Sequence, residues 1–199
     1  MTTNSSRNPV LLVHGFFINS IVFRKMSAYL RERGWSIYSF DFVQKYGSLG
    51  LDELAEQLKS YIEKTFPPEQ RLNLVGLSMG GIVSRYYLQR LGGIERVERF
   101  ITISSPHHGT WMAYLLPTLP CVQMRPNSQF LQDLNRDAIV LDQVNFVSTW
   151  TRWDFIIVPG SSSQLGDKTI ELPVFTHACM ARHPKSLETV ERFLESFEF

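Results

Sequence analysis

The sequence predicts an α/β fold in which helices cover both faces of a mostly parallel sheet. Short apolar segments alternate with segments of helical periodicity, roughly every 30 to 40 residues. Continuously apolar strands are typical of parallel sheets, because both faces of such a sheet are buried. A length of 199 residues with 44% apolar residues suits one domain with a sizeable core. We therefore expect residues 1–199 to form one domain, with a flexible N-terminus over residues 1–8.

The apolar and periodic patterns give an order of elements. Strands are expected at 9–13, 35–42, at the run that enters Gly76, and at 97–103, 144–150 and 169–175. Helices are expected at 21–30, at 51–62, from the segment after Gly76 to residue 91, at 128–135 and from 184 onward, where Leu187, Val190, Phe193, Leu194 and Phe197 form an apolar face. Four prolines divide residues 105–127 into turns and at most one short helix.

Composition and charge exclude several classes of function. Twenty Lys and Arg residues nearly balance nineteen Asp and Glu residues. The formal net charge is therefore only +1, which does not favour binding to nucleic acid. The polar start lacks the apolar centre of a signal peptide, and no apolar run is long enough to span a bilayer. Cys121 and Cys179 are too few for a disulfide framework. We expect a cytoplasmic monomer without nucleic-acid partners that makes at most transient contact with a membrane surface.

The segment around Ser78 carries the clearest chemical signal. An apolar run reaches Gly76, passes through Ser78 and Gly80, and continues as an apolar segment of helical period. Gly-x-Ser-x-Gly between a strand and a helix is the nucleophile elbow, in which the serine sits on a sharp, strained turn. Small residues flank the serine because the chain doubles back there. We expect Ser78 to be a nucleophile.

A serine nucleophile needs a base within hydrogen-bond reach and a carboxylate that orients the base. In doubly wound sheets these partners follow later strands, in the order serine, acid, histidine. Asp154 follows the strand at 144–150, and His177 follows the strand at 169–175. We favour His177 over His183, which stands just before Pro184 and suits a helix cap.

Two backbone N–H groups should stabilise the oxyanion of the tetrahedral intermediate. One belongs to Met79, directly after the nucleophile, and the other to Phe16 in the His14-Gly15-Phe16 loop after the first strand. His14 itself is expected to make structural hydrogen bonds. His107 and His108 are adjacent and have no carboxylate at ligand spacing, so we expect neither a metal nor a cofactor.

These motifs together resemble the small bacterial lipases and esterases of the α/β-hydrolase fold. The likeness rests on Val13-His14-Gly15-Phe16, on the Ser78 elbow, on the Pro106-His107-His108-Gly109-Thr110 run, and on Asp154 and His177, so it covers nearly the whole chain. It implies a Ser78–Asp154–His177 triad, oxyanion donors at Phe16 and Met79, no cofactor, and hydrolysis of carboxylic esters such as acylglycerols or membrane glycerolipids. Unlike secreted lipases of this type, the chain shows no evident large lid.

Apolar residues near these motifs are candidates for the walls of an acyl pocket, although the same residues would also suit core filling. The candidates are Phe17, His107, Trp111 and Leu115, and the sequence leaves open whether residues 111–126 move as a lid. Two other functions use the same residues: transfer of the acyl group to an acceptor other than water, and ligand binding without catalysis.

Overall fold

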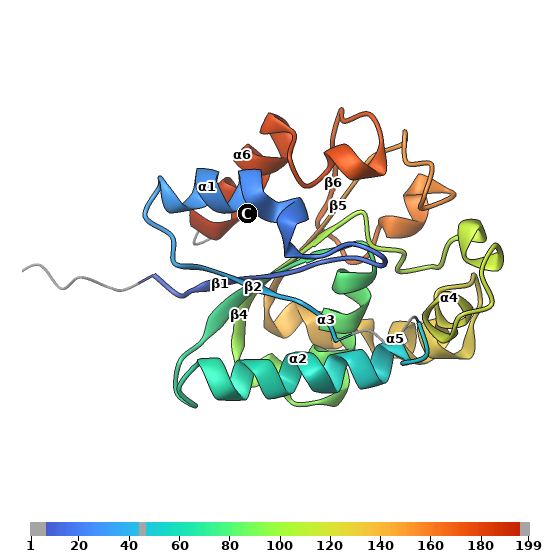
Figure 1. Cartoon of the computed structure of the whole chain (residues 1–199), viewed down its shortest axis with the longest axis horizontal. Helices are drawn as coiled ribbons and strands as arrows, with labels where there is room; N and C mark the ends of the chain where they lie inside the picture. Colours follow the sequence, from blue (N-terminus) through green and yellow to red (C-terminus); the bar gives the residue numbers. More distant parts are fainter. Residues whose placement is uncertain (1–6, 44–46, 196–199) are drawn as a thin grey trace, which may run out of the picture.

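The computed structural model describes residues 7–43 and 47–195 and contains a six-stranded sheet with helices on both sides (Figure 1). All five strand pairings are parallel, and the order across the sheet is β2-β1-β3-β4-β5-β6. The carboxyl ends of all six strands therefore lie at one edge, and the loops that follow them share that edge. The predicted mostly parallel α/β fold is confirmed.

The central strands are the most buried. β1 (Val10–Val13) and β3 (Leu72–Leu77) consist only of buried residues, and β4 (Val97–Ile103) has a single half-buried position. Their apolar side chains fill both layers of the core because β1, β3 and β4 are covered on both faces. The outer strands are β2 (Ile37–Phe40), β5 (Asn145–Trp150) and β6 (Thr169–Glu171).

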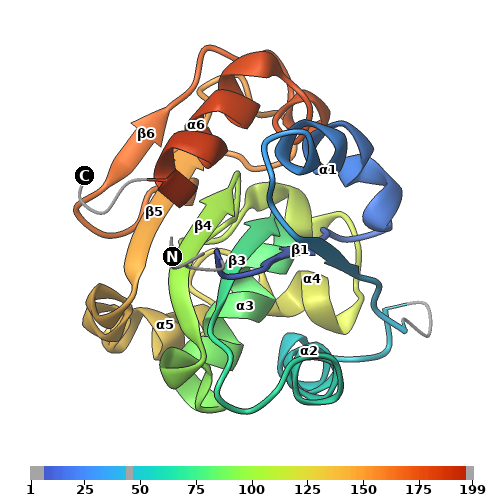
Figure 2. The same cartoon turned by 90° about the vertical axis from the view of Figure 1, so that its left-hand side faces the viewer.

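The helices divide between the two faces of the sheet (Figure 2). On one face α1 (Arg24–Arg31), preceded by a 3₁₀ turn over Ser20–Phe23, packs beside α6 (Pro184–Glu195). On the other face lie α2 (Leu51–Thr65), α3 (Met79–Arg90) and α5 (Gln129–Arg136). The chain between β4 and α5 contains only a 3₁₀ turn over Trp111–Tyr114 and the five-residue helix α4 (Leu119–Gln123), as the prolines predicted.

The final strand is shorter than the predicted 169–175. The Leu172 N–H still bonds Trp150 O in β5, but the Val174 N–H then bonds Leu172 O across Pro173. This three-residue turn ends the pairing, because Pro173 has no N–H to donate to a ladder. His177 consequently lies in a separate 3₁₀ turn, His177–Cys179, and not at the end of a strand.

Residues near both chain ends can be compared with the expectations from sequence. The expected flexibility of residues 1–8 stays a prediction. Of these residues, Arg7 and Asn8 lie within the described part of the chain, and the Arg7 guanidinium donates to Arg33 O at 2.8 Å and lies 4.7 Å from the centre of the Trp35 ring. Residues 1–6 lie outside the described residues. In α6 the predicted apolar contacts Leu187, Val190, Phe193 and Leu194 are buried, and Phe197 lies outside the described residues.

Candidate active site

Ser78 occupies the turn between β3 and α3, as the elbow motif predicted. Its backbone has φ 55° and ψ −125°, which a non-glycine residue rarely adopts. A Cβ on Gly80 would lie 2.2 Å from Val13 O, and a Cβ on Gly76 would lie 2.5 Å from the Cα of Gly81. Neither position can therefore carry a side chain. The turn holds Ser78 at the carboxyl edge of the sheet, and its N–H bonds Ile103 O of β4 at 2.8 Å.

The loop after β1 lies directly against the serine. A Cβ built on Gly15 would be 3.0 Å from Cβ of Ser78, so Gly15 allows the two backbones to approach. The backbone N–H groups of Phe16 and Met79 have no hydrogen-bond acceptor within the described part of the chain. Met79 is also the first residue of α3, where the helix dipole favours negative charge. These two donors fit the predicted oxyanion site.

His14 fastens this loop to the neighbouring strand. The Phe42 N–H donates to Nε2 of His14 at 3.2 Å, which makes Nε2 the acceptor and leaves the hydrogen on Nδ1 for Gly15 O, 2.8 Å away. Burial lowers the pKa of His14, and this outweighs the opposing influence of Gly15 O and Asp41. A neutral His14 therefore has the structural role expected of it.

Asp154 and His177 meet at the same edge of the sheet. Nδ1 of His177 is 2.8 Å from Oδ2 of Asp154, whereas Oδ1 accepts the N–H groups of Ile156 and Ile157, both at 2.9 Å. Burial by itself would raise the pKa of Asp154, but the hydrogen bond and charge of His177 and the two backbone donors outweigh it and lower the pKa. The carboxylate is thus ionised at neutral pH and orients the imidazole.

Ser78 and His177 are not joined by a hydrogen bond among the residues described. Ser78 is 8% exposed and the His177 side chain is 14% exposed, so both remain within reach of solvent. Hydrogen bonds between a nucleophile and its base are often long without substrate and shorten in the complex. The Asp154–His177 pair is therefore formed here, and the link to Ser78 remains a prediction.

The alternative base, His183, has a different role in the structure. Its Nδ1 accepts the Lys185 N–H at 3.3 Å, just before α6 begins at Pro184. This is the capping position expected of it. The residue before His177, Thr176, has φ 73° and ψ 145°, a strained conformation for a β-branched residue that sequence reasoning had not identified.

Thr110 connects the loop that holds Asp154 to the loop after β4. Its hydroxyl donates to Ile156 O at 2.8 Å and accepts the N–H groups of Val158 at 2.9 Å and Met112 at 3.3 Å. One donor and two acceptor sites are all that a hydroxyl has, so the group is fully satisfied. Since Ile156 N–H also supports Asp154, Thr110 fixes the backbone that positions the carboxylate.

His107, an expected pocket residue, is completely buried instead. Nη1 of Arg85 donates to its Nδ1 at 3.3 Å, and Oγ1 of Thr102 lies 3.0 Å from its Nε2. Burial lowers the pKa of His107 well below its usual range, and the charge of Arg85 lowers it further. The placement does not support a role in the pocket wall, because the ring is fully enclosed and its two nitrogens face Arg85 and Thr102.

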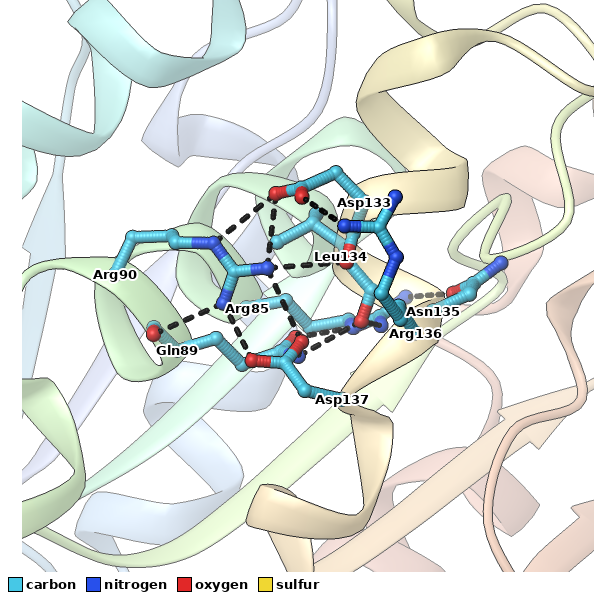
Figure 3. A network of polar contacts seen from close by, with 8 residues as sticks. All are labelled: Arg85, Gln89, Arg90, Asp133, Leu134, Asn135, Arg136 and Asp137. Carbon is cyan, nitrogen blue, oxygen red and sulfur yellow. Dashed lines mark hydrogen bonds and ion pairs between the residues drawn. The ribbon is translucent and has the colours of Figure 1, made fainter.

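The same arginine begins a polar network between α3 and α5 (Figure 3). Arg85, which is 0% exposed, also donates to Asn135 Oδ1 and Leu134 O, both at 3.0 Å. Arg90, one turn further along α3, forms ion pairs with Asp133 and Asp137. The network secures α3, the helix that follows Ser78, against the chain after the Pro106–Thr110 run, a long-range arrangement that the sequence pattern did not reveal.

The other three pocket candidates lie at the surface of the carboxyl edge. Phe17 is 65% exposed, Trp111 59% and Leu115 69%, so they are not core filling. Phe16 is half-buried, and its ring contacts that of Phe17 at a tilt of 40° with ring centres 4.0 Å apart. These exposures are compatible with a surface that contacts an apolar substrate.

Neither a metal-binding cluster nor a membrane-spanning helix is found in the described part of the chain. No group of three or more His, Cys, Asp or Glu side chains there could hold a metal ion. Within residues 7–43 and 47–195, every helix is too short or too polar to cross a bilayer.

The parallel sheet, the strained serine elbow and the histidine–carboxylate pair place the chain in the α/β-hydrolase class. The mature lipase BlEst2 of Bacillus licheniformis has a similar fold, with a TM-score of 0.75 at 15% identity over 96% of this chain and 93% of the lipase. Lipase B of Aspergillus fumigatus gives a TM-score of 0.79 at 20% identity over 92% of this chain and 51% of that enzyme. At such identities the likeness concerns the fold.

The chain belongs to the palmitoyl protein thioesterase family, whose model matches residues 9–140. The human lysosomal thioesterase PPT2 is 31% identical over 125 residues, which cover 57% of this chain and 40% of that protein. The chain thus corresponds to less than half the length of this relative. The family match includes Phe16, Ser78 and Met79 but ends before Asp154 and His177, so the pairing of those two rests on geometry.

Proposed function

We propose that the protein hydrolyses fatty-acyl esters and thioesters through an acyl-enzyme on Ser78. The observation that carries the proposal is the Asp154–His177 pair, 2.8 Å apart, at the edge where the elbow presents Ser78. Family membership supports the thioester as a substrate class, which was not among the expectations from sequence. Acylglycerols and membrane glycerolipids remain the oxyester candidates.

The reaction begins at Ser78. Nε2 of His177 takes the hydroxyl proton as Oγ attacks the acyl carbonyl, and the resulting oxyanion accepts hydrogen bonds from the N–H groups of Phe16 and Met79. His177 then gives its proton to the departing alcohol or thiol, leaving the acyl group on Ser78. Water, deprotonated by His177, attacks this acyl-enzyme, and His177 returns that proton to Oγ of Ser78 as the fatty acid leaves.

Asp154 acts through the imidazole. Its carboxylate accepts the Nδ1 hydrogen of His177, which leaves Nε2 free to act as the base. Once His177 is protonated, the buried negative charge stabilises the imidazolium. The hydrogen bonds from Ile156 and Ile157 keep the carboxylate ionised and its orientation fixed.

A series of p-nitrophenyl esters of increasing chain length, run beside a palmitoyl thioester, tests the substrate class. The proposal predicts turnover of both bond types, preference for longer acyl chains, and loss of both activities in Ser78→Ala. Turnover that survives in Ser78→Ala would contradict the mechanism. Preference for acetyl over all longer chains would contradict the fatty-acyl assignment.

Two other functions remain open and are separable by experiment. An acyltransferase using the same triad would form a new ester when an alcohol acceptor is added, which product analysis detects. A non-catalytic binding protein would fail to react with a fluorophosphonate that labels activated serines. The monomeric state and cytoplasmic location expected from sequence remain predictions.

A further inference from the structure

Large apolar side chains are exposed together around the candidate active site. We call six of them the apolar collar; each is between 46% and 69% exposed, and they are Phe17, Trp111, Leu115, Trp153, Phe155 and Phe175. They come from the loops after β1, β4, β5 and β6, and parallel strands place all four loops at one edge. Exposed apolar residues scattered singly need no explanation, whereas a group at one functional edge marks a binding surface.

Contacts between the loops after β4, β5 and β6 hold this part of the collar together. The rings of Trp153 and Phe175 stack with centres 5.6 Å apart, which joins the loops after β5 and β6. The Trp111 N–H donates to Val158 O at 3.0 Å, and Thr110 adds the hydrogen bonds described above, which join the loops after β4 and β5. In Figure 1 the loops after β4 and β5 lie at the right-hand end of the sheet.

The collar also borders the nucleophile. A Cβ on Gly15 would lie 3.0 Å from the Cβ of Ser78 and 3.5 Å from the Cδ1 of Ile18, which is 41% exposed and follows Phe17. Trp153 and Phe155 flank Asp154, and Phe175 stands two residues before His177. Whatever covers the collar therefore lies over the site where Ser78 would accept an acyl group.

The charge pattern identifies the kind of surface that fits. Residues 14–22, 111–124, 153–160 and 172–179 contain no Lys, Arg or Glu and a single Asp, the buried Asp154, in a chain with 39 charged residues. The charged residues that directly adjoin these ranges are Arg125, Arg152 and Glu171, and the last two form an ion pair with each other. Anionic membranes are recognised by clusters of Lys and Arg, and charged protein partners by complementary charges. Trp, Tyr and Phe without charges are typical of side chains that enter the boundary between lipid chains and headgroups.

We infer that the apolar collar docks the protein on an electrically neutral lipid surface, with Ser78 facing the lipid. The docking itself does not require catalysis. The inference rests on the proposed function in one respect, namely that docking brings Ser78 to acyl chains that leave the lipid phase. Binding is driven by burial of the collar, so it does not depend on anionic lipid or on salt. A second copy of the chain is the alternative occupant, because two collars could cover each other.

Flotation with vesicles of dialkyl-ether phosphatidylcholine tests the inference, since ether lipids cannot be hydrolysed at Ser78. We expect binding that is unchanged between about 0.05 and about 0.5 M NaCl and not increased by added phosphatidylglycerol. Leu115→Asp and Phe155→Asp should each weaken binding by about tenfold or more, because each puts a charge where docking would bury an apolar side chain. Ile139→Asp is the matched control: Ile139 is 75% exposed in the 3₁₀ turn before β5 and should bind normally.

Three results would overturn the inference: no binding to phosphatidylcholine, binding that requires phosphatidylglycerol and disappears in high salt, or equal loss in Ile139→Asp. A dimer in solution that dissociates in Leu115→Asp would assign the collar to a second copy and would also overturn it. Labelling of Ser78 by a fluorophosphonate is measured on the same samples. Unlabelled protein that still floats would refute the proposed function alone, and labelled protein that does not float would refute the docking surface alone.

Discussion

Nδ1 of His177 lies 2.8 Å from Oδ2 of Asp154, although the two residues are 23 positions apart and neither belongs to a β-strand. The relationship depends on two loops at one edge of the sheet. The Asp154 loop is held by Thr110, and the His177 turn follows the strained residue Thr176. A buried carboxylate that accepts hydrogen bonds from an imidazole and from two backbone N–H groups has the features of the orienting acid in serine hydrolases.

Asp154→Asn should reduce kcat by about 10³- to 10⁴-fold while the protein remains folded. The amide oxygen can still accept the hydrogen bonds from Ile156 and Ile157, but an amide NH₂ facing His177 stabilises the tautomer in which Nε2 is protonated and cannot act as a base. Steady-state kinetics with a p-nitrophenyl ester measures the effect, and thermal unfolding checks the fold. Near-normal kcat in a folded Asp154→Asn protein would remove Asp154 from the mechanism.

His177→Ala should impair catalysis, whereas His183→Ala should mainly reduce stability. The first removes the proposed base, so kcat should fall by about 10³-fold or more. The second removes the acceptor for the Lys185 N–H and should cost about 0.5–1 kcal/mol of unfolding free energy with little change in kcat. Paired kinetics and urea unfolding of both variants give the comparison. A catalytic loss confined to His183→Ala would show that the base is assigned to the wrong histidine.

Thr110→Val should lower kcat by about 10- to 100-fold, because the loop that supports Asp154 loses its anchor and small misplacements of a catalytic group are costly. Thr110→Ser keeps the hydroxyl and should restore most of kcat. The informative readout is the separation of kcat from KM, together with the pH at which kcat falls on the acid side, which should shift in the valine variant alone. Equal behaviour of the two variants would assign Thr110 a purely structural role.

Stability should decrease as pH falls from about 7 toward about 5. Burial lowers the pKa of His14, His107 and His108 in the folded protein, whereas in the unfolded chain their pKa stays near 6.5. Below this value the unfolded state binds more protons than the folded state, so the free energy of unfolding decreases as pH is lowered. The lowered pKa of Asp154 adds a further loss only when pH drops below its unfolded value of about 3.9.

Urea unfolding at several pH values measures this dependence, with His107→Gln as the informative variant. Removing one buried imidazole should make the decrease in unfolding free energy shallower between pH 7 and pH 5. A free energy of unfolding that rises toward pH 5 would contradict the assignment of these histidines as neutral in the folded state.

Much of the fold was predictable because its signals are local. Continuous apolar runs indicated buried parallel strands, and β4 has the predicted bounds Val97–Ile103. The elbow was predictable for the same reason, since the glycines around Ser78 are demanded by contacts of under 3 Å within a few residues or with the adjacent strand.

The features that the sequence did not reveal depend on contacts between distant segments. The hydroxyl of Thr110 finds its partners 46 and 48 residues away, and Arg85 reaches His107 from a different element. The burial of His107 could not be read from a His-His pair in a loop, because its partners Arg85 and Thr102 belong to α3 and β4. The short final strand follows from Pro173, a signal that was present but was outweighed by the apolar residues around it.

The most direct test of the central claim compares kcat/KM of wild type and Ser78→Ala for a palmitoyl thioester, with thermal unfolding as the check on folding. We expect a loss of at least about 10⁴-fold, with an unfolding midpoint close to that of wild type. Hydrolysis by folded Ser78→Ala at a rate near that of wild type would show that Ser78 is not the nucleophile.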